Sequence, residues 1–383
     1  QGSNGPDDYL KPFYVQRQDS TDVVITQEDK LLQVPSAYAQ INLMQKVRFR
    51  PTKNWDIQYG FHYSETSSNG RYDRHNRLRN GTARYAEWNY GPQKWLMNNL
   101  SITNYSNQLI YDQLTVRLAH QSFEESRIER LLNSEDRMVR KEEVGAYSAN
   151  IDMLKKTGTN NTFFYGVEYV INDITSTGID EDILSGLQTE GPSRYPQSTW
   201  ESIGIYLSDE YLINELISVQ SGIRFNQFKI DAAFDTRFYP FPFETASLNN
   251  GALTGSIGAV IRPSKSLVLR TNLGSAFRSP NIDDIGKVFD SGDQQVVVPN
   301  PDLDAEYAYN IDVGVAKVFA DRIKLDITAY YTKLNNALVR RDFSLNGEDS
   351  IVYDGEMSKV QAIQNAAEAN VYGIQLGLDV NLG

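Results

Sequence analysis

The sequence predicts an all-β protein, an antiparallel transmembrane β-barrel. Apolar and polar residues alternate through long stretches such as 303–315 and 323–331, and this two-residue period places successive side chains on opposite faces of a strand. The stretches reach about ten residues, whereas strands of soluble proteins usually stop after five or six. Short and long connections also alternate between them. This is the pattern of outer-membrane barrels.

Composition agrees with this interpretation. The 383-residue chain has no apolar run near 18 residues, which excludes transmembrane helices but not strands that hide lipid-facing residues by alternation. It is rich in aromatic residues, with 23 Tyr and 16 Phe, and Tyr and Trp favour the two membrane–water interfaces. A net charge of −12 argues against a nucleic-acid partner. The absence of Cys excludes thiolate sites, and three His argue against a His-rich metal site, so neither a metal nor a cofactor is expected.

The chain divides into an extracellular loop region, 1–36, and a barrel segment of about 13 strands, 37–383. The loop region is polar and irregular apart from Val23–Thr26, and its start, Gln1–Asp8, has no signal peptide. The last strand is expected at 372–381, with 359–369 as a loop leading into it. Short turns are expected near 51–54, 106–108, 157–161, 213–215, 263–266 and 319–322. Long connections are expected near 65–94, 124–138, 173–199, 232–248, 280–302 and 342–359.

The strand count is odd, and the chain is expected to open outside and to end in the periplasm. Because single-chain bacterial barrels have even strand counts, this indicates a piece of a larger barrel.

Alternation also assigns the two faces of the wall. The residues expected to face lipid are Tyr59, Phe61, Ile311, Val313, Ile327, Leu376 and Leu378. Those expected to line the lumen are Asp56, Gln58, Arg270, Asp312, Asp326 and Asp379.

Two short motifs carry a resemblance to a known family. The strand from Leu267 ends in Phe277-Arg-Ser-Pro280, and Asn300-Pro-Asp-Leu303 opens the next strand after a loop. In this order the motifs resemble the C-terminal half of TonB-dependent outer-membrane receptors. The resemblance implies a barrel of about 22 strands, plugged by an N-terminal domain. The plug, the TonB box and the usual last strands are absent here, so residues 1–383 could not transport alone in the family's manner.

The resemblance implies a function in nutrient import and not in catalysis. The expected cargo is a ferric siderophore or another iron complex. Implied partners are the TonB complex, through the absent plug, and outer-membrane lipid and lipopolysaccharide, with a surface lipoprotein as a further candidate. Haem receptors of the family carry a His between the two motifs, and 281–299 contains none. Haem, cobalamin or glycan import stays an alternative, as does a passive porin or a non-transporting surface-binding barrel.

Three places are candidates for ligand contact. Arg278, Asn281 and Asp283 follow the first motif, and Arg278 has the inward parity of Arg270. It either pairs with a wall carboxylate or meets an anionic ligand. Loop 71–94 mixes cationic and aromatic residues, which suit an iron–catecholate complex or a belt that meets lipopolysaccharide phosphates. Loop 237–243 is too aromatic for a freely solvated loop, so it either packs inward over the mouth or lies at the outer interface. Their candidate residues are Arg84, Trp88, Tyr239 and Phe241.

Overall fold

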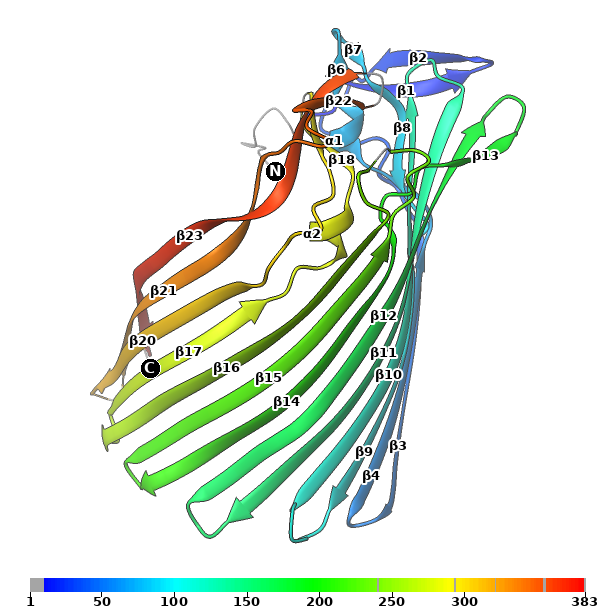
Figure 1. The fold of residues 1–383 in the computed structure, drawn as a ribbon. Coiled ribbons are helices and arrows are strands. Elements are labelled where there is room, and N and C mark those ends of the chain that lie inside the picture. The colour runs from blue at the N-terminus through cyan, green and yellow to red at the C-terminus, as the bar shows by residue number, and fades with distance from the viewer. Residues whose placement is uncertain (1–9, 240, 293, 321, 354–355, 382–383) are drawn as a thin grey trace.

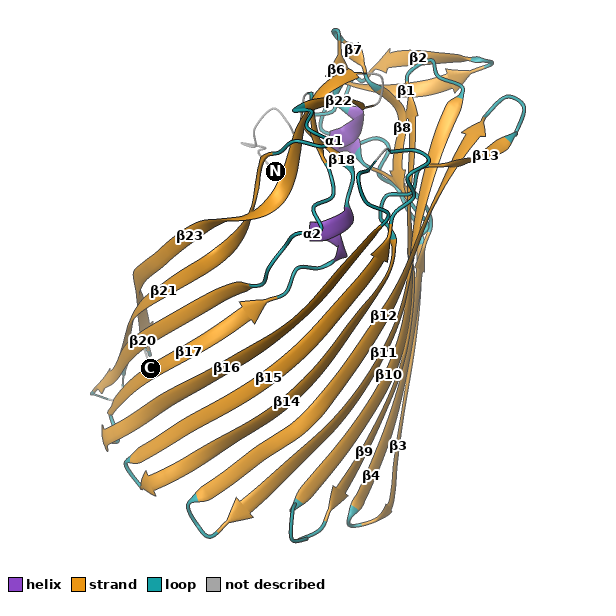
Figure 2. Ribbon diagram, in the orientation of Figure 1, coloured by secondary structure: helices purple, strands orange, loops and turns teal. Residues whose placement is uncertain are grey.

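The computed structural model describes residues 10–381 apart from 240, 293, 321 and 354–355. Most of this part of the chain is strand, as predicted (Figure 2). Its two helices, α1 (Tyr72–His75) and α2 (Ile282–Gly286), are too short to cross a bilayer. The expectation for Gln1–Asp8 lies outside the described residues.

Thirteen strands of at least 12 residues, counted over the described residues, form one antiparallel sheet. Neighbours along the chain pair in register over long distances, as in the β10–β11 hairpin from Gln113↔Leu154 to Arg130↔Arg137. In sheet order the strands are β3 (Gln40–Thr52), β4 (Trp55–Thr66), β9 (Lys94–Tyr105), β10 (Gln113–Leu131), β11 (Asp136–Thr157), β12 (Asn161–Asp182), β14 (Gln197–Asn214), β15 (Ile217–Ala233), β16 (Thr245–Ser264), β17 (Leu267–Arg278), β20 (Glu306–Phe319), β21 (Ile323–Asp342) and β23 (Glu356–Val380).

The sheet curves like the wall of a barrel and is open at its two ends (Figure 1). Within the described residues β3 pairs with β4, and β23 pairs with β21 and short loop strands, but no pairing joins β3 to β23. Short turns gather at one end of the sheet and longer segments at the other (Figure 1). We call these the turn end and the loop end.

The two faces follow the predicted alternation. Val313 is 51% exposed and Leu376 is 70% exposed, as lipid-facing side chains of an isolated wall should be. On the other face, Arg270 of β17 reaches across β20 to Asp326 of β21. The remaining predicted lipid-facing residues are also exposed, except Phe61, which is half-buried.

Exposed tyrosines form a row on the outward face of the wall, a pattern typical of a membrane–water interface. Tyr59 and Tyr169 stand at the same level of the sheet, because the register connects them through Leu100, Leu118 and Ala149 on the strands between. Tyr147, two residues further along β11, stacks on His120 with ring centroids 4.7 Å apart. Tyrosine favours this boundary because its ring is apolar and its hydroxyl is wet.

Two connections differ from the prediction. The residues 124–138, expected as a long loop, mostly continue β10 and β11, which meet in a tight turn containing Asn133 at φ 61°. The residues 359–369, expected as a loop, belong to β23 and pair with the end of β21. In both segments cross-strand pairing determines the structure against the local sequence preference. Residues 124–138 are polar on both strand faces, and residues 359–369 have a composition that favours a helix.

The N-terminal region is more ordered than expected. Residues 13–26 form a hairpin of β1 (Phe13–Gln18) and β2 (Thr21–Thr26), turning at Asp19 with φ 52°. Arg130, 2% exposed, donates to both carboxylate oxygens of Asp22 at 2.7 and 2.9 Å. This ion pair fixes the hairpin to the loop end of β10. The extracellular placement of residues 1–36 stays a prediction.

The loop end is folded into small cores. The residues between β4 and β9 contain α1, β5 (Asn69–Gly70), β6 (Leu78–Arg79), β7 (Thr82–Ala83) and β8 (Tyr85–Tyr90). Further short strands are β13 (Gln188–Gly191), β18 (Phe289–Gly292), β19 (Gln295–Val297) and β22 (Ser350–Tyr353). Val296 and Val360, both 0% exposed, pack where β19 lies parallel to β23. Ile285 of α2 and Leu303 join a second core with Phe234.

Candidate functional site

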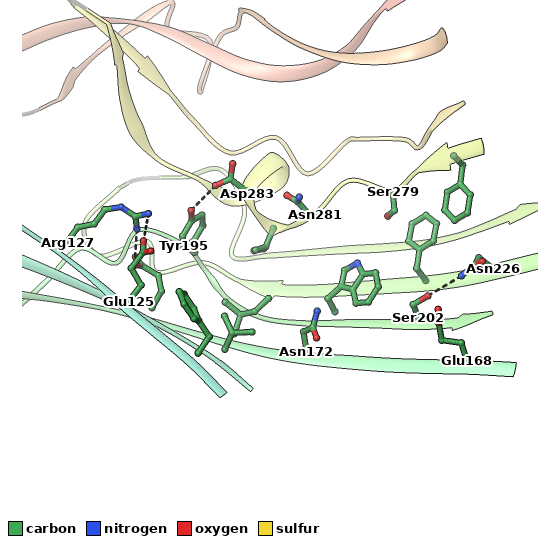
Figure 3. Close-up of a pocket in the computed structure, with 18 residues that line it drawn as sticks. Glu125, Arg127, Glu168, Asn172, Tyr195, Ser202, Asn226, Ser279, Asn281 and Asp283 are labelled. Atoms are coloured by element: carbon green, nitrogen blue, oxygen red, sulfur yellow. Dashed lines mark hydrogen bonds and ion pairs between the residues drawn. The ribbon is translucent and has the colours of Figure 1, made fainter. Parts of the chain in front are cut away.

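A cavity of about 730 Å³ lies at the loop end of the wall, between the strands and α2 (Figure 3). β10, β11, β12, β14 and β15 form its floor, and α2 with the end of β17 forms its roof. Its aromatic and aliphatic lining consists of Phe123, Val144, Ile174, Tyr195, Trp200, Phe228, Phe277 and Ile282. Its polar lining consists of Glu125, Arg127, Glu142, Glu168, Asn172, Ser202, Asn226, Ser279, Asn281 and Asp283.

The strand lengths put the cavity beyond the lipid-facing band expected of a barrel wall. A tilted strand crosses the lipid with about 9–11 residues. The strands β10, β11 and β12 have 19, 22 and 22 residues, so their loop-end halves extend beyond the bilayer. Glu125 and Glu142 are paired partners in these halves.

The roof is held by the first motif. Pro280 ends β17, and Asn281 caps α2 by accepting a hydrogen bond of 3.0 Å from the backbone N–H of Asp284. The Asp284 carboxylate in turn accepts from the Asn281 N–H, which completes a capping box. Arg278 binds the same carboxylate at 2.6 Å and Glu306 at 2.9 Å. These contacts fix α2 against β17 and β20.

Tyr195 connects the roof to the floor. Its hydroxyl donates a hydrogen bond of 2.7 Å to Asp283 (Figure 3). Its backbone N–H donates one of 3.3 Å to the Ser176 hydroxyl. Burial raises the pKa of the Tyr195 hydroxyl, which therefore stays a donor at neutral pH. Burial alone would raise the pKa of Asp283, but hydrogen bonds from Lys287 and Tyr195 outweigh it and lower that pKa.

Three glutamates face the cavity from adjacent strands. Glu125 binds Arg127 at 2.5 Å and Gln93 at 3.0 Å. Glu168 binds Arg224 at 2.8 Å and Asn150 at 2.9 Å. Glu142 uses one carboxylate oxygen, which accepts from Arg127 at 3.0 Å.

Burial raises the pKa of Glu142 to about 7. The guanidinium groups of Arg127, Arg194 and Arg140 oppose this rise, and the Glu125 carboxylate adds to it. Ionisation of Glu142 therefore falls in the neutral range, whereas an ordinary glutamate ionises near pH 4.3.

The structure brings two of the predicted contact residues to the cavity. Asn281 and Asp283 line it directly. Arg278 does not line it and is held by Asp284 and Glu306, with its side chain 47% exposed. Of the two interpretations of Arg278, the geometry shows carboxylate pairing, with Glu306 of the wall and with Asp284 of α2.

Arg84 and Trp88 lie in a separate cluster. Trp88 is 8% exposed, and Arg71 and Arg74 cover its ring at 5.2 and 5.5 Å from the centroid. Arg84 lies 5.1 Å from the ring centroid of Tyr85. The cation–π contacts expected for a ligand are thus made within the protein.

Tyr239 and Phe241 pack into the loop-end cores. Phe241 stacks on Phe243 at 5.8 Å and meets Phe234 edge to face at 5.7 Å. Tyr239 lies against Phe241 and Tyr353. Both side chains are half-buried, which agrees with packing over the mouth. Residue 240 of this loop lies outside the described residues.

Sequence reasoning missed the floor. Glu125 and Arg127 lie in the expected connection 124–138, and Glu142 and Trp200 lie just beyond the connections 124–138 and 173–199, where the sequence predicts no site. The available signal was charged residues at lumen parity next to aromatic ones, as in Phe123, Glu125 and Arg127. In the part of the chain that the structure describes, no cluster of His, Asp and Glu has metal-binding geometry. The cavity offers hydrogen bonds, charge and aromatic contact to a molecule that enters from the loop end.

Comparison with known proteins identifies the family that shares this fold. The chain matches the family described as TonB dependent receptor-like, beta-barrel, over residues 4–383. No curated protein matches it. Among similar solved structures is the copper transporter OprC, with 13% identity and a TM-score of 0.71 over 91% of this chain and 51% of that one.

Two further structures are similar. A double mutant of the Serratia marcescens hemophore receptor HasR, solved with its hemophore HasA and heme, has 14% identity and a TM-score of 0.66, covering 90% of this chain and 52% of its own. The siderophore receptor PiuA from Acinetobacter baumannii has 14% identity and a TM-score of 0.63, covering 91% and 55%. These likenesses show a shared fold.

The chain spans about half the length of these solved structures. Their barrel fold accounts for the curvature of the open sheet, for its alternating faces and for its alternating short and long connections. With the family match covering residues 4–383, this chain belongs to the TonB-dependent receptor family, as a segment of its β-barrel.

Proposed function

We propose that this chain is part of an outer-membrane receptor that captures a scarce nutrient at its outer mouth and imports it with energy relayed by the TonB complex. The observation that carries the proposal is the 730 Å³ cavity at the loop end, lined by aromatic and polar groups. A cavity of this size suits a small-molecule ligand, for which concave, largely apolar sites with a few placed polar groups are typical.

The substrate class that we favour is a ferric siderophore or another iron complex. Similar structures include proteins named as a siderophore receptor and as a copper transporter, which puts metal complexes first among the candidates. Trp200, Phe228 and Phe277 offer the aromatic surface on which a bulky chelate could stack. A plug domain elsewhere in the full-length protein would supply the contact with the TonB complex.

Growth under iron limitation tests the proposal. A deletion strain should grow poorly on at least one ferric siderophore of a panel that also includes haem, and the full-length gene should restore growth. Trp200→Ala, which removes cavity surface, should restore it less well. The matched control is Trp55→Ala at the turn end, where the side chain is 42% exposed and remote from the cavity.

Wild-type growth of the deletion strain on every iron source would remove iron import and leave cobalamin, glycan fragments or another metal. The reading frame of the full-length protein separates active import from passive diffusion. A plug domain with a TonB box upstream supports import. A strand that follows directly on a signal peptide would support a porin instead.

A further inference from the structure

Carboxylates outnumber cations in the cavity lining. Its charged lining residues are Glu125, Glu142, Glu168 and Asp283 against Arg127. Cations outside the lining offset this excess, at Arg224 for Glu168, at Lys287 for Asp283, and at Arg194 and Arg140 near Glu142. A carboxylate in a partly enclosed site attracts a cation more strongly than one on an open surface, because fewer waters screen the charges.

One acceptor in this lining is unsatisfied. Both carboxylate oxygens of Glu125 and of Glu168 have partners, whereas Oε1 of Glu142 has no hydrogen-bond partner. Glu142 is only 6% exposed, so bulk solvent has little access to it. A buried acceptor without a donor costs about 1–3 kcal/mol, and more when it is charged.

Glu142 shares its one donor with a neighbouring carboxylate. Arg127 divides its guanidinium between Glu125 and Glu142. Ser176 is paired with Glu142 in the β11–β12 register, and its hydroxyl accepts from the Tyr195 N–H. Glu142 nevertheless lines the cavity, so a turn of its side chain brings Oε1 to a bound molecule without moving the backbone.

Apolar surface adjoins this acceptor. Val144 lies two positions along β11 on the same face, and Phe123 lies two positions from Glu125 on β10. Further along the cavity, Phe228 stacks on Phe277 with centroids 5.7 Å apart. An ammonium group near Glu142 would place the body of its molecule against these side chains, where an aromatic ring also attracts a cation.

We propose that Glu142 accepts a protonated amine of the ligand, so that this receptor selects molecules that join an amine to an apolar body. The inference rests on the proposed function, because it names the chemistry of the ligand that the same cavity would take. It differs from the expectation of an anionic ligand held by Arg278, because Arg278 is engaged with Asp284 and Glu306.

The pH dependence gives the first test. Only the carboxylate form of Glu142 attracts an ammonium, and its pKa is about 7 in the empty cavity. Arg127, Arg194 and Arg140 favour that form, and Glu125 opposes it. Affinity for an amine should therefore be full at pH 8 and fall as the pH drops from 7 to 6, a range in which an alkylamine stays charged. An anionic ligand, which would need the protonated acid, would show the opposite trend.

Two probes that differ only in the amine give the second test. The purified full-length receptor in detergent is titrated with 4-phenylbutylamine and with 4-phenylbutanol at pH 8, followed by tryptophan fluorescence, since Trp200 lines the cavity. The amine should bind about tenfold more tightly, the ratio that corresponds to one charged hydrogen bond. Glu142→Gln should abolish this preference.

Glu143→Gln is the matched control. Glu143 is the next residue on β11, so its side chain, 52% exposed, points to the opposite face of the wall, and this variant should keep the preference for the amine. Thermal unfolding of each variant shows whether it is folded. Equal binding of the two probes by the wild type, or an undiminished preference in Glu142→Gln, would overturn the inference.

The outcome is separable from that of the proposed function. Growth on ferric siderophores does not enter the probe titration. A preference for the amine with no growth phenotype would sustain the cavity chemistry and refute iron import. A growth phenotype with no preference for the amine would sustain iron import and refute the role of Glu142.

Discussion

The hydroxyl of Tyr195 and the carboxylate of Asp283 form a hydrogen bond of 2.7 Å between segments that are 88 residues apart in the chain. Tyr195 follows β13, and Asp283 lies in α2. Because the Tyr195 backbone also binds Ser176 on β12, this side chain connects the floor of the cavity to its roof. The position of α2 therefore depends on a contact that the wall provides.

Tyr195→Phe should loosen the roof. The change removes one hydrogen bond to a charged group and keeps the ring, so local opening of α2 should become easier by about 1 kcal/mol, or about fivefold. Hydrogen exchange of the backbone amides of 283–286 measures this directly. Tyr169→Phe, on the lipid-facing row, is the control and should leave these amides unchanged. Equal exchange in wild type and Tyr195→Phe would show that the capping box holds α2 without this contact.

Arg278→Ala should loosen the attachment of α2 to the wall, and any effect on ligand binding should follow from that. Its loss leaves Asp284 and Glu306 without their shared partner, and the first of these carboxylates caps α2. Because the Arg278 side chain is 47% exposed, water screens both pairs, and the local cost should be about 1 kcal/mol or less. Faster exchange at 283–286 is the expected result.

Arg270→Ala is the comparison for Arg278→Ala. Arg270 also pairs with a carboxylate, Asp326, but lies nearer the turn end of β17 and does not touch α2. Exchange at α2 should not respond to it. A large loss of affinity for an anionic siderophore in Arg278→Ala, with α2 exchange unchanged, would restore the ligand-binding reading of Arg278.

The N-terminal hairpin should detach when Asp22 loses its charge. Asp22→Asn removes the bidentate partner of Arg130, which is 2% exposed and keeps Glu87 and the Ser134 carbonyl, so the cost should lie below the roughly 3–5 kcal/mol of leaving a buried charge unpaired. Limited proteolysis at the Asp19–Ser20 turn should become faster. Asp29→Asn, whose carboxylate accepts only a local backbone hydrogen bond at 3.0 Å, is the control.

Acid should release the same hairpin. Burial alone would raise the pKa of Asp22, but hydrogen bonds from Arg130 and from the Asn133 backbone outweigh it, so the folded pKa lies below its usual value. A depressed pKa stabilises docking above the unfolded value of about 3.9 and loses that contribution as the pH falls through the folded pKa. Proteolysis of the hairpin should be constant from pH 8 to 5 and rise only below about pH 4. A rise already near pH 6 would assign the effect to another group.

Much of the wall could be predicted because lipid imposes a strict alternation. Val313 and Leu376 face outward as expected, since the strand period is two and one face must be apolar. The signal ends where the strands leave the membrane. Beyond that level both faces meet water, so β10 and β11 continue through 124–138 without an apolar face to reveal them.

The candidate site could be predicted only where local sequence signals mark it. Asn281 and Asp283 follow a motif with a proline and a capping sequence, which local rules can detect. Glu142 and Trp200 are brought together only by the register of strands far apart in the chain. Trp88, although cationic residues surround it in the sequence, is buried by those same residues.

Gly178→Ala should disturb the cavity indirectly, through the segment that carries Tyr195. An added Cβ at Gly178 would lie 2.2 Å from the carbonyl oxygen of Pro192 and 2.5 Å from that of Gly191, so backbone must move. The segment that would shift carries Tyr195 to the cavity. Overpacking of this kind costs about 1–3 kcal/mol. Thermal unfolding and α2 exchange should both respond, whereas Gly145→Ala, with open space around its Cβ, should change neither.

Nitroxide labels at Val313 and Asp312 should report opposite environments. The two residues are adjacent on β20, so their side chains point to opposite faces of the wall. Val313, 51% exposed in the isolated wall, should meet lipid, and Asp312 should face the lumen with Asn272 and Arg270. In the full-length receptor in bilayers, oxygen should relax the label at 313 more strongly, and a water-soluble nickel chelate should relax the label at 312. Equal access of both reagents at the two positions would contradict a barrel wall here, because only a strand between lipid and water separates neighbouring residues in this way.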